Sequence, residues 1–308
     1  MTGERVPVLL ISGCSRSGAT LLAQMLAGAD EVVAPGELRC LWQAGILENR
    51  RCDCGELFFS CPFWRKTMER GLGGPDAVDP RRMLRLQADI DRVWRIPALI
   101  STPEENTAWE LAEYLSYHEL LYRAIVDVSG ARVVVDSSKE PSFGHVLARS
   151  QAIDLSVVHL VRDSRAVSHS RARGGRHAGT EPPLPRQPPW RSALEWDMAN
   201  LAAGWLARRV ARSIRLRYED LACDPEAALA AVLELIGVRD RPPLEGGRVP
   251  LGSGHALWSA PTLRRGSASI HPDEDWQTEM ADSTRALVTA LTWPGLLAYG
   301  YSPAVEGT

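Results

Sequence analysis

"GCSRSGAT", residues 13–20, follows the apolar run "VPVLLI" at residues 6–11 and precedes an apolar segment with helical spacing. The stretch nearly matches the phosphate-binding pattern G-x-x-x-x-G-K-[ST]: both glycines and the closing threonine are present, but Ala19 takes the place of the lysine. Such a loop presents backbone N–H groups and a helix N-terminus to an anion. Arg16, inside the loop, offers a cation in place of the missing lysine. The sequence therefore predicts a strand, an anion-binding loop and a helix.

The rest of the chain alternates between short apolar runs and longer amphipathic segments. Near-continuous apolar strands between helices favour a parallel sheet that helices cover on both faces. In such sheets ligands bind at the carboxyl ends of the strands. The expected strands are residues 6–11, 132–135, 155–161 and 214–218, and the expected helices are residues 20–26, 109–128, 191–211 and the segment between Asp224 and Gly237.

Polar residues follow these strands at the places where a ligand is expected. "DSSK", residues 136–139, comes after the second strand, and "RDSRAVSHS", residues 162–170, comes after the third. Arg162 and Ser170 would lie about two helical turns apart. A basic residue at a helix N-terminus opposes the helix dipole, which makes better sense if an anion binds there.

The loop and the Arg–Ser pair together resemble the sulfotransferases that use 3′-phosphoadenosine-5′-phosphosulfate (PAPS). Residues 13–21 are similar to that family's 5′-phosphosulfate loop, in which a Lys or Arg stands at the position of Arg16. Arg162 and Ser170 match the spacing of the residues that hold the 3′-phosphate. In "LRYEDLACDP", Tyr218 matches a tyrosine near the nucleotide. The resemblance also explains the missing lysine, because PAPS has no γ-phosphate.

Further segments extend the resemblance to the bacterial branch over nearly the whole chain, among them "VDSSKEP" at residues 135–141 and "HPDEDWQTEM" at residues 271–280. The implied fold is α/β, a three-layer P-loop-like sandwich whose central parallel sheet is flanked by helices. We expect a single domain over residues 1–308. A helical insertion at about 65–130 would lie over the acceptor side, and a mobile loop at about 173–190 would act as a lid.

The resemblance also implies a mechanism of in-line sulfuryl transfer that depends on positioning and charge stabilisation and requires no metal. Glu37, in "EVVAPGELRCLW", would be the general base, with His145 as the next candidate. Arg16 would stabilise the leaving 3′,5′-bisphosphate (PAP), and Lys139 would bind the sulfonate where another branch has a histidine. The expected nucleotide-binding residues are Ser15, Arg16, Ser17, Gly18, Ala19, Thr20, Arg162, Ser170, Tyr218, Arg264, Arg265 and Gly266.

Two other functions are compatible with the same residues. A P-loop kinase or NTPase would use residues 134–136 as the strand that ends in a magnesium-binding aspartate. A catalytically inactive nucleotide-binding module would keep the loop without the chemistry, although Glu37, Arg16 and Lys139 argue against it.

The cysteines form a separate cluster in the sequence. Cys40, Cys52, Cys54 and Cys61 precede or flank the aromatic segment "ELFFSCPFW". Their spacing contains no C-x₂-C pair of the kind typical of zinc sites. Buried thiols that pack with the aromatic residues are therefore expected, with zinc or a disulfide left as alternatives and no metal assigned.

Composition limits the partners. The formal net charge of −3 gives no overall basic field for nucleic acid. No apolar stretch approaches the length of a membrane span, and no signal peptide is evident. We therefore expect a cytoplasmic protein whose acceptor is a hydroxyl of a small molecule: a natural product, a sugar or a lipid head group. The oligomeric state stays open, a homodimer included.

Overall fold

The computed structural model describes residues 4–102, 108–174, 186–242, 248–251, 254–257, 266–270 and 272–303. Its strands are β1 (Val6–Gly13), β2 (Val32–Gly36), β3 (Val133–Lys139), β4 (Ile153–Val161), β5 (Arg212–Arg217), β6 (Arg248–Leu251) and β7 (Gly266–Ser269). Its α-helices are α1 (Ala19–Leu26), α2 (Pro62–Leu72), α3 (Pro80–Ile90), α4 (Ile96–Ser101), α5 (Trp109–Ser129), α6 (Pro141–Leu147), α7 (Ser164–Arg173), α8 (Pro189–Ala207), α9 (Tyr218–Cys223), α10 (Pro225–Leu235), α11 (Asp275–Glu279) and α12 (Asp282–Ala298). Short turns of 3₁₀- or π-helix are η1 (Leu38–Cys40), η2 (Leu41–Leu47), η3 (Phe58–Ser60), η4 (Pro75–Ala77) and η5 (Val93–Arg95).

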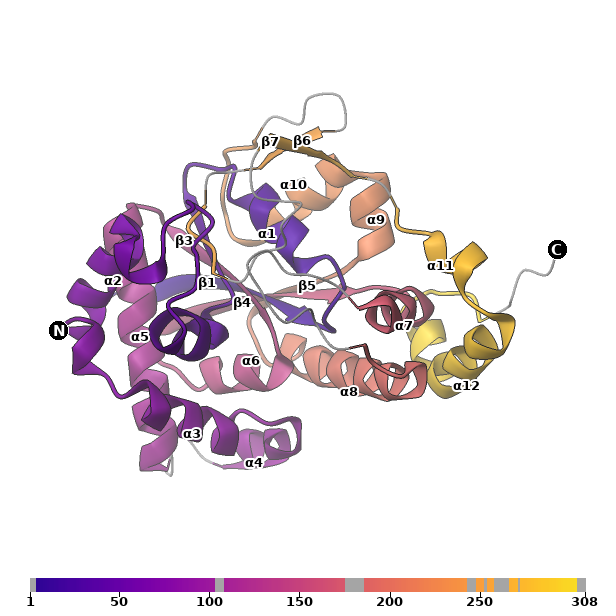
Figure 1. Cartoon of the computed structure of the whole chain (residues 1–308), viewed down its shortest axis with the longest axis horizontal. Helices are drawn as coiled ribbons and strands as arrows, with labels where there is room; N and C mark the ends of the chain where they lie inside the picture. Colours follow the sequence, from indigo (N-terminus) through magenta and orange to yellow (C-terminus); the bar gives the residue numbers. More distant parts are fainter. Residues whose placement is uncertain are drawn as a thin grey trace.

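A five-stranded parallel sheet with the order β2-β3-β1-β4-β5 forms the centre of the molecule (Figure 1). β1 pairs with β4 without interruption, from Val6 opposite Ile153 to Gly13 opposite Leu160. β1 also pairs with β3, but the register shifts before Ser12 meets Lys139. β6 and β7 form a separate antiparallel hairpin.

Both faces of the sheet are buried, which explains why β1 is apolar throughout rather than alternating. Val8 and Leu10 point into a core shared with α2, α5, α6 and α8. Leu9 and Ile11 point the other way, into a core shared with α1, α9 and α10. Figure 1 shows these two helical layers above and below the sheet. The predicted three-layer α/β sandwich is confirmed.

The connections that leave β1 and β3 diverge. α1 follows β1 and packs in one layer, whereas α6 follows β3 and packs in the other. Neighbouring strands whose connections go to opposite faces leave a crevice at their carboxyl ends, where ligands of α/β proteins bind. Here the loop after Gly13 and Lys139 at the end of β3 lie at those carboxyl ends.

Most element boundaries follow the sequence signals. Asp224 caps α10 by accepting a hydrogen bond from the backbone N–H of Ala227 (3.0 Å), and Pro225 opens that helix, as predicted. β3 is longer than predicted, because "DSSK" continues the strand. Four helices, α2 to α5, connect β2 to β3. The division into one domain with a helical insertion stays a prediction.

The predicted mobile loop at 173–190 falls largely outside the described residues, which stop at 174 and resume at 186. None of the described helices has the length and apolar character that crossing a bilayer requires.

Candidate functional site

The loop after β1 has the backbone form of an anion-binding site. Arg16 and Gly18 have left-handed φ angles of 71° and 93°, and Gly18 is the N-cap of α1 without a side-chain cap. The first N–H groups of a helix need partners from outside the helix. The Ser17 hydroxyl is buried and has no hydrogen-bond partner among the described residues. The loop therefore offers backbone and side-chain donors to a ligand.

Three arginines converge on this loop. Burial and the positive charges of Arg171 and Arg162 hold the pKa of Arg16 below its usual value. Arg171, on α7, donates to the hydroxyl of Ser15 and contacts the sulfur of Cys14 at 3.2 Å. Like charges this close repel, and an anion between them would relieve that repulsion.

Arg162 is held by hydrogen bonds, an ion pair and a contact with an aromatic ring. Its guanidinium donates to the backbone oxygen of Arg16 (3.0 Å) and to a carboxylate oxygen of Asp273 (2.7 Å). It also lies over the ring of Tyr218, 4.4 Å from the ring centre. Burial alone would raise the pKa of Asp273, but the hydrogen bond and charge of Arg162 hold it below its usual range.

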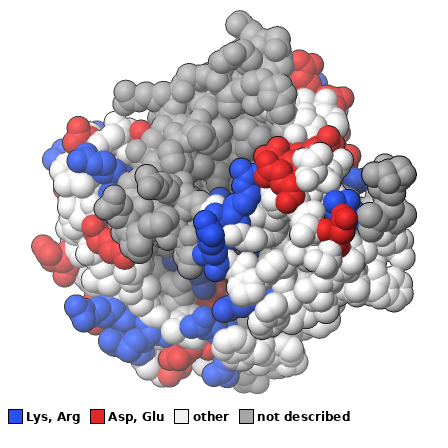
Figure 2. Space-filling view, turned by 45° about the vertical axis from the view of Figure 1, so that its right-hand side comes forward, with Lys and Arg blue, Asp and Glu red and all other residues white. Residues whose placement is uncertain are grey.

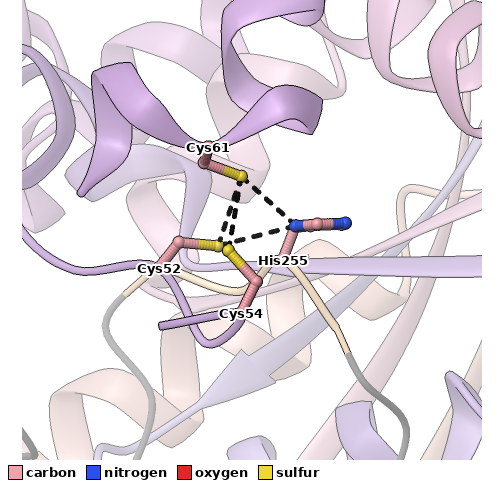
Figure 3. A group of neighbouring side chains, drawn as sticks. All are labelled: Cys52, Cys54, Cys61 and His255. Atoms are coloured by element: carbon pink, nitrogen blue, oxygen red, sulfur yellow. Dashed lines mark hydrogen bonds between the residues drawn. The ribbon is translucent and has the colours of Figure 1, made fainter. Parts of the chain in front are cut away.

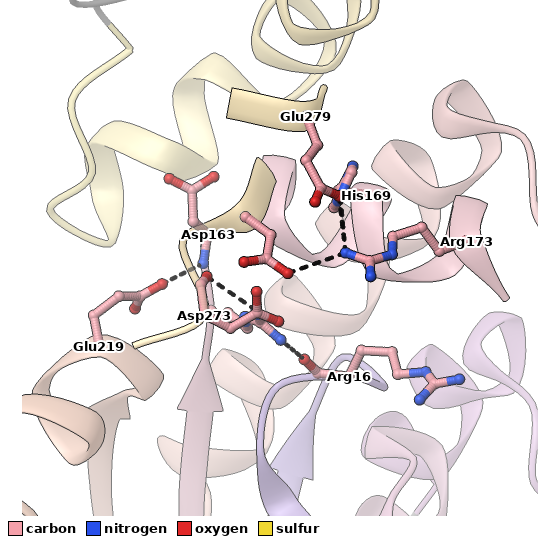
Figure 4. A network of polar contacts seen from close by, with 9 residues as sticks. Arg16, Asp163, His169, Arg173, Glu219, Asp273 and Glu279 are labelled. Atoms are coloured by element: carbon pink, nitrogen blue, oxygen red, sulfur yellow. Dashed lines mark hydrogen bonds and ion pairs between the residues drawn. The ribbon is translucent and has the colours of Figure 1, made fainter. Parts of the chain in front are cut away.

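Both positively and negatively charged side chains surround the three arginines. Figure 4 shows the side chain of Arg16 extending away from Asp273, while Arg173 faces the carboxylate of Glu279. Figure 2 shows a band of Lys and Arg side chains with a cluster of Asp and Glu beside it. Because the chain as a whole is slightly acidic, the positive field at the loop is local.

Glu37 and Lys139 form an ion pair at the same edge of the sheet. Glu37 follows β2 and is only 8% exposed, and Lys139 ends β3 with a left-handed φ of 66°. The Lys139 ammonium donates to Glu37 Oε1. The backbone oxygen of Lys139 accepts a hydrogen bond from the hydroxyl of Ser12 (3.3 Å), which is the residue just before the loop. The carboxylate, the ammonium and the loop therefore lie at one edge of the sheet.

Asp136 supports the Glu37–Lys139 ion pair through a set of hydrogen bonds. Tyr122 donates to its Oδ2 at 2.6 Å, and the backbone N–H of Ser138 donates to its Oδ1 at 2.8 Å. The Ser138 hydroxyl in turn accepts from the backbone N–H of Arg39, just after Glu37 (3.1 Å). Burial raises the pKa of Asp136 to about 6, against the lowering effect of these hydrogen bonds. Asp136 is fully buried and both its oxygens accept hydrogen bonds from the protein, which argues against a role as the magnesium ligand of a kinase-like site.

The comparisons with known proteins agree with this geometry. A profile of the sulfotransferase family matches residues 7–242 of the chain. The chain belongs to the sulfotransferase family.

Solved structures resemble this sulfotransferase over almost its full length. The sulfotransferase domain of the Synechococcus PCC 7002 olefin synthase is 21% identical, covers 95% of this chain and 97% of its own, and superposes with a TM-score of 0.51. The sulfotransferase domain from the curacin biosynthetic pathway is 20% identical, covers 97% of this chain and 100% of its own, with a TM-score of 0.55. At these identities the likeness concerns the fold. No curated protein matches the chain significantly.

The structure of the sulfotransferase brings together most of the residues proposed from the sequence. Ser15 to Gly18 form the loop, Ala19 and Thr20 begin α1, and Tyr218 begins α9 beside them. Ser170 lies on α7 and makes no side-chain hydrogen bond to another described residue. Arg264 and Arg265 lie outside the described residues, and Gly266 begins β7.

The second candidate base, His145, is in the wrong place. It lies on α6 and is 2% exposed, with Nε2 3.2 Å from the backbone oxygen of Ala202 on α8. Burial lowers its pKa to about 4. The sequence placed His145 close to the "DSSK" segment along the chain, but the helix turns its ring into the core. Glu37 is therefore the better candidate.

Two contacts at the site were not predicted. No motif in the sequence assigns a role to Arg171 or to Asp273. The adjacent Ser170 was a usable signal for Arg171, because both lie on the same helix. No comparable signal marks Asp273, which reaches Arg162 across 111 residues of sequence.

Gly18 gives a first prediction. A Cβ at this position would lie 2.6 Å from a ring carbon of Tyr218, at a φ that side chains rarely adopt. We expect Gly18→Ala to lower the free energy of unfolding by about 1–2 kcal/mol. Because it also displaces the ring that supports Arg162, we expect it to weaken PAP binding roughly tenfold. Thermal denaturation and calorimetric titration would measure the two effects.

Gly130→Ala is the matched control. Gly130 also has a left-handed φ of 72°, but nothing lies within 4 Å of a Cβ added at this position. It should carry the backbone strain without a change in PAP affinity. Equal PAP affinity in Gly18→Ala and Gly130→Ala would contradict the role given to the Gly18–Tyr218 contact.

Proposed function

We propose that this sulfotransferase transfers the sulfuryl group of PAPS to a hydroxyl group of a small-molecule acceptor. The observation that supports this most strongly is the convergence of Arg16, Arg162 and Arg171 on a loop that already presents free donors. A ligand with two separated phosphate groups suits such an arrangement better than a single carboxylate, since each group can take a cation of its own.

The nucleotide would be held at both ends. The loop amides, the Ser17 hydroxyl and Arg16 are proposed to bind the 5′-phosphosulfate, because the start of α1 has no side-chain cap and the Ser17 hydroxyl has no partner among the described residues. Arg162 and Ser170 are proposed to hold the 3′-phosphate, with Tyr218 beside them. Arg162 Nε has no partner among the described residues, so the guanidinium retains a donor for the ligand while it keeps its contact with Asp273.

The ion pair supplies the groups that the transfer needs. Glu37 is proposed to accept the proton of the acceptor hydroxyl as that oxygen bonds to sulfur. Lys139 would bind the sulfonate oxygens, and Arg16 would stabilise charge on the phosphate oxygen that leaves. In the structure Lys139 contacts Glu37 and borders the loop. The same ammonium is thus placed to pair with Glu37 and to lie beside the transferred group.

The chemical class of the acceptor is proposed from the sources of the two solved structures. The two solved relatives come from an olefin synthase and from the curacin biosynthetic pathway. On that basis we propose a hydroxyl of a natural product or its precursor, with sugars and lipid head groups as the alternatives, and a cytoplasmic reaction.

Sulfate transfer tests the proposal directly. The purified chain would be incubated with PAPS labelled in its sulfuryl group and a panel of hydroxylated acceptors, and the products would be followed by mass spectrometry. We expect PAP and a sulfated acceptor in equal amounts. Transfer of phosphate from ATP, with no use of PAPS, would overturn the proposal in favour of the kinase-like alternative.

Metal dependence gives a second prediction. Because Asp136 is fully buried and hydrogen-bonded to Tyr122 and Ser138, the aspartate of the kinase-like alternative is not open to a magnesium ion. We expect the initial rate with PAPS to be the same with EDTA, with excess Mg²⁺ and with neither. The zinc content of the EDTA-treated protein should be measured alongside, so that loss of a structural ion is not mistaken for a magnesium requirement. An obligatory Mg²⁺ would contradict the mechanism.

A further inference from the structure

Three cysteines and one histidine meet away from the proposed nucleotide site. The Sγ atoms of Cys52, Cys54 and Cys61 and the Nδ1 atom of His255 all lie within 4.8 Å of one another (Figure 3). Cys61 Sγ is 3.6 Å from Cys54 Sγ, 3.7 Å from Cys52 Sγ and 3.3 Å from His255 Nδ1. Cys52 Sγ is 3.7 Å from the same nitrogen. The four groups therefore surround one point.

These distances have the size of a tetrahedral zinc site. With Zn–S near 2.3 Å and Zn–N near 2.05 Å, a regular tetrahedron has edges of about 3.8 Å between sulfurs and about 3.6 Å between sulfur and nitrogen. The sulfur–sulfur separations of 3.6 and 3.7 Å lie just below the first value, and the sulfur–nitrogen separations of 3.3 and 3.7 Å lie on either side of the second. A Cys₃His set is one of the usual combinations in structural zinc sites.

The backbone around the cysteines holds their side chains in this arrangement. Gly55, with φ of 97°, closes a tight turn in which its N–H donates to the Cys52 oxygen (2.9 Å), and an antiparallel bridge joins Arg51 to Leu57. This turn brings Cys52 and Cys54 to one side. Cys61 is the N-cap of α2, so the start of that helix fixes the position of its backbone.

His255 is oriented by aromatic neighbours. Its ring stacks on Phe63, with 4.7 Å between ring centres and 6° between the planes. Trp64 Nε1 donates to the backbone oxygen of His255 at 2.8 Å. Figure 3 shows the ring edge with Nδ1 directed at the sulfurs and the other nitrogen directed away. The stacking on Phe63 and the hydrogen bond to the backbone of His255 hold the ring in this orientation.

We propose that Cys52, Cys54, Cys61 and His255 bind a structural Zn²⁺ ion. Binding replaces three S–H bonds by Zn–S bonds and releases three protons to solvent, and no electrons are transferred. Because the protein would supply all four ligands, the ion would have no open position for substrate, which is typical of a structural site rather than a catalytic one.

The alternatives from the sequence explain less of this arrangement. Buried thiols do pack here, since Cys52, Cys61, Phe58 and Trp64 are fully buried. Packing alone gives no reason for an imidazole nitrogen to face two sulfurs. A disulfide would join two of the thiols and leave the third thiol and the histidine unused. Cys40, the fourth cysteine considered from the sequence, points instead at Glu37 Oε2, 3.8 Å away.

The site would brace the proposed general base. Residues 254–257, which carry His255, extend the edge of β2: Leu257 N donates to the Pro35 oxygen (3.0 Å), and Leu257 O accepts from Glu37 N (3.5 Å). The approach is so close that a Cβ on Gly36 would lie 2.4 Å from Leu257 O. The ion would join this segment to the start of α2 and keep it beside Glu37.

Metal analysis of the full chain tests the site without any substrate. Protein purified under reducing conditions from zinc-supplied cells is expected to contain about one Zn²⁺ per chain by mass spectrometry of the metal. A mercurial that blocks thiols should release this zinc, seen with a chromogenic chelator. Protein produced with cobalt should show thiolate-to-cobalt charge-transfer bands and the visible spectrum of a tetrahedral ion.

Variants assign the ligands. Cys61→Ser and His255→Ala are expected to lower zinc content at least about tenfold, since loss of one ligand weakens a closed site strongly. Cys223→Ser is the matched control, because Cys223 is exposed and lies on α9, and it should keep full zinc. If a ligand variant does not fold, the wild-type metal content and cobalt spectrum still decide the question.

Three results would overturn the proposal: reduced wild-type protein that takes up no zinc when it is supplied, Cys61→Ser that retains full zinc, or a mass showing two of the three thiols joined in a disulfide in the reduced preparation. Since zinc is measured without PAPS, a zinc-loaded protein that transfers no sulfate would reject only the proposed function.

Discussion

Glu37→Gln should lower turnover by roughly two to four orders of magnitude and leave PAP affinity almost unchanged. Glutamine keeps the size of the side chain and can still accept from the Lys139 ammonium, so the contact at the end of β3 persists. What it loses is the basicity needed to remove the acceptor proton. Steady-state kinetics with PAPS and saturating acceptor, together with calorimetric titration of PAP, would separate the two effects.

Glu31→Gln is the matched control for this variant. Glu31 lies just before β2 and also forms an ion pair, with Arg132 at 2.6 Å, but the pair is exposed. Exposed ion pairs contribute little, so turnover should stay within about twofold of wild type. If Glu37→Gln turned over normally, the proton would leave without a base, since His145 is buried against α8. If it bound PAP poorly, the role of Glu37 would be structural.

Lys139 shows why the ion pair could be anticipated only in part. The sequence placed Lys139 after a strand, and the family resemblance placed Glu37 at the same site, although β2 was not among the expected strands. That argument predicts that Glu37 and Lys139 lie near each other, but it does not predict that they form an ion pair. The registers of β3 with β1 and with β2 are both irregular near this edge, and no local sequence signal marks either irregularity.

The loop was predictable for the opposite reason. Its conformation depends on residues that are adjacent in the chain: an apolar strand, Gly18 at a left-handed φ, and an apolar helix. Both faces of β1 are covered, so its unbroken apolar run was a reliable sign of a parallel sheet. Local chemistry of this kind can be derived from the sequence without knowledge of the packing.

The Cys₃His cluster could not be derived in this way. Cys52, Cys54 and Cys61 are close in sequence, but His255 joins them from 194 residues beyond Cys61. Its position follows from the pairing of residues 254–257 with the edge of β2. Three cysteines alone fitted buried thiols, and the fourth ligand became visible only with the tertiary structure.

Arg162→Ala should discriminate between two ligands that differ by one phosphate. If Arg162 holds the 3′-phosphate, its loss should weaken PAP by about 10–150-fold, which corresponds to the roughly 1.5–3 kcal/mol of a hydrogen bond to a charged group. Binding of the analogue without the 3′-phosphate should weaken far less. The residual effect on that analogue has a structural source, because Arg162 also supports the Arg16 backbone and lies over Tyr218.

Two further variants make this prediction decisive. Arg173→Ala removes the same charge from an exposed arginine on α7 that pairs with Asp275 and Glu279, and it should leave the ratio of the two affinities unchanged. Asp273→Asn removes the carboxylate that now shares Arg162, so it should tighten PAP and hardly affect the analogue. The readout is the ratio of the two dissociation constants, measured for each variant by calorimetry. Equal losses for both ligands in Arg162→Ala would remove Arg162 from the 3′-phosphate, and weaker PAP binding in Asp273→Asn would show that the carboxylate positions the guanidinium rather than competing for it.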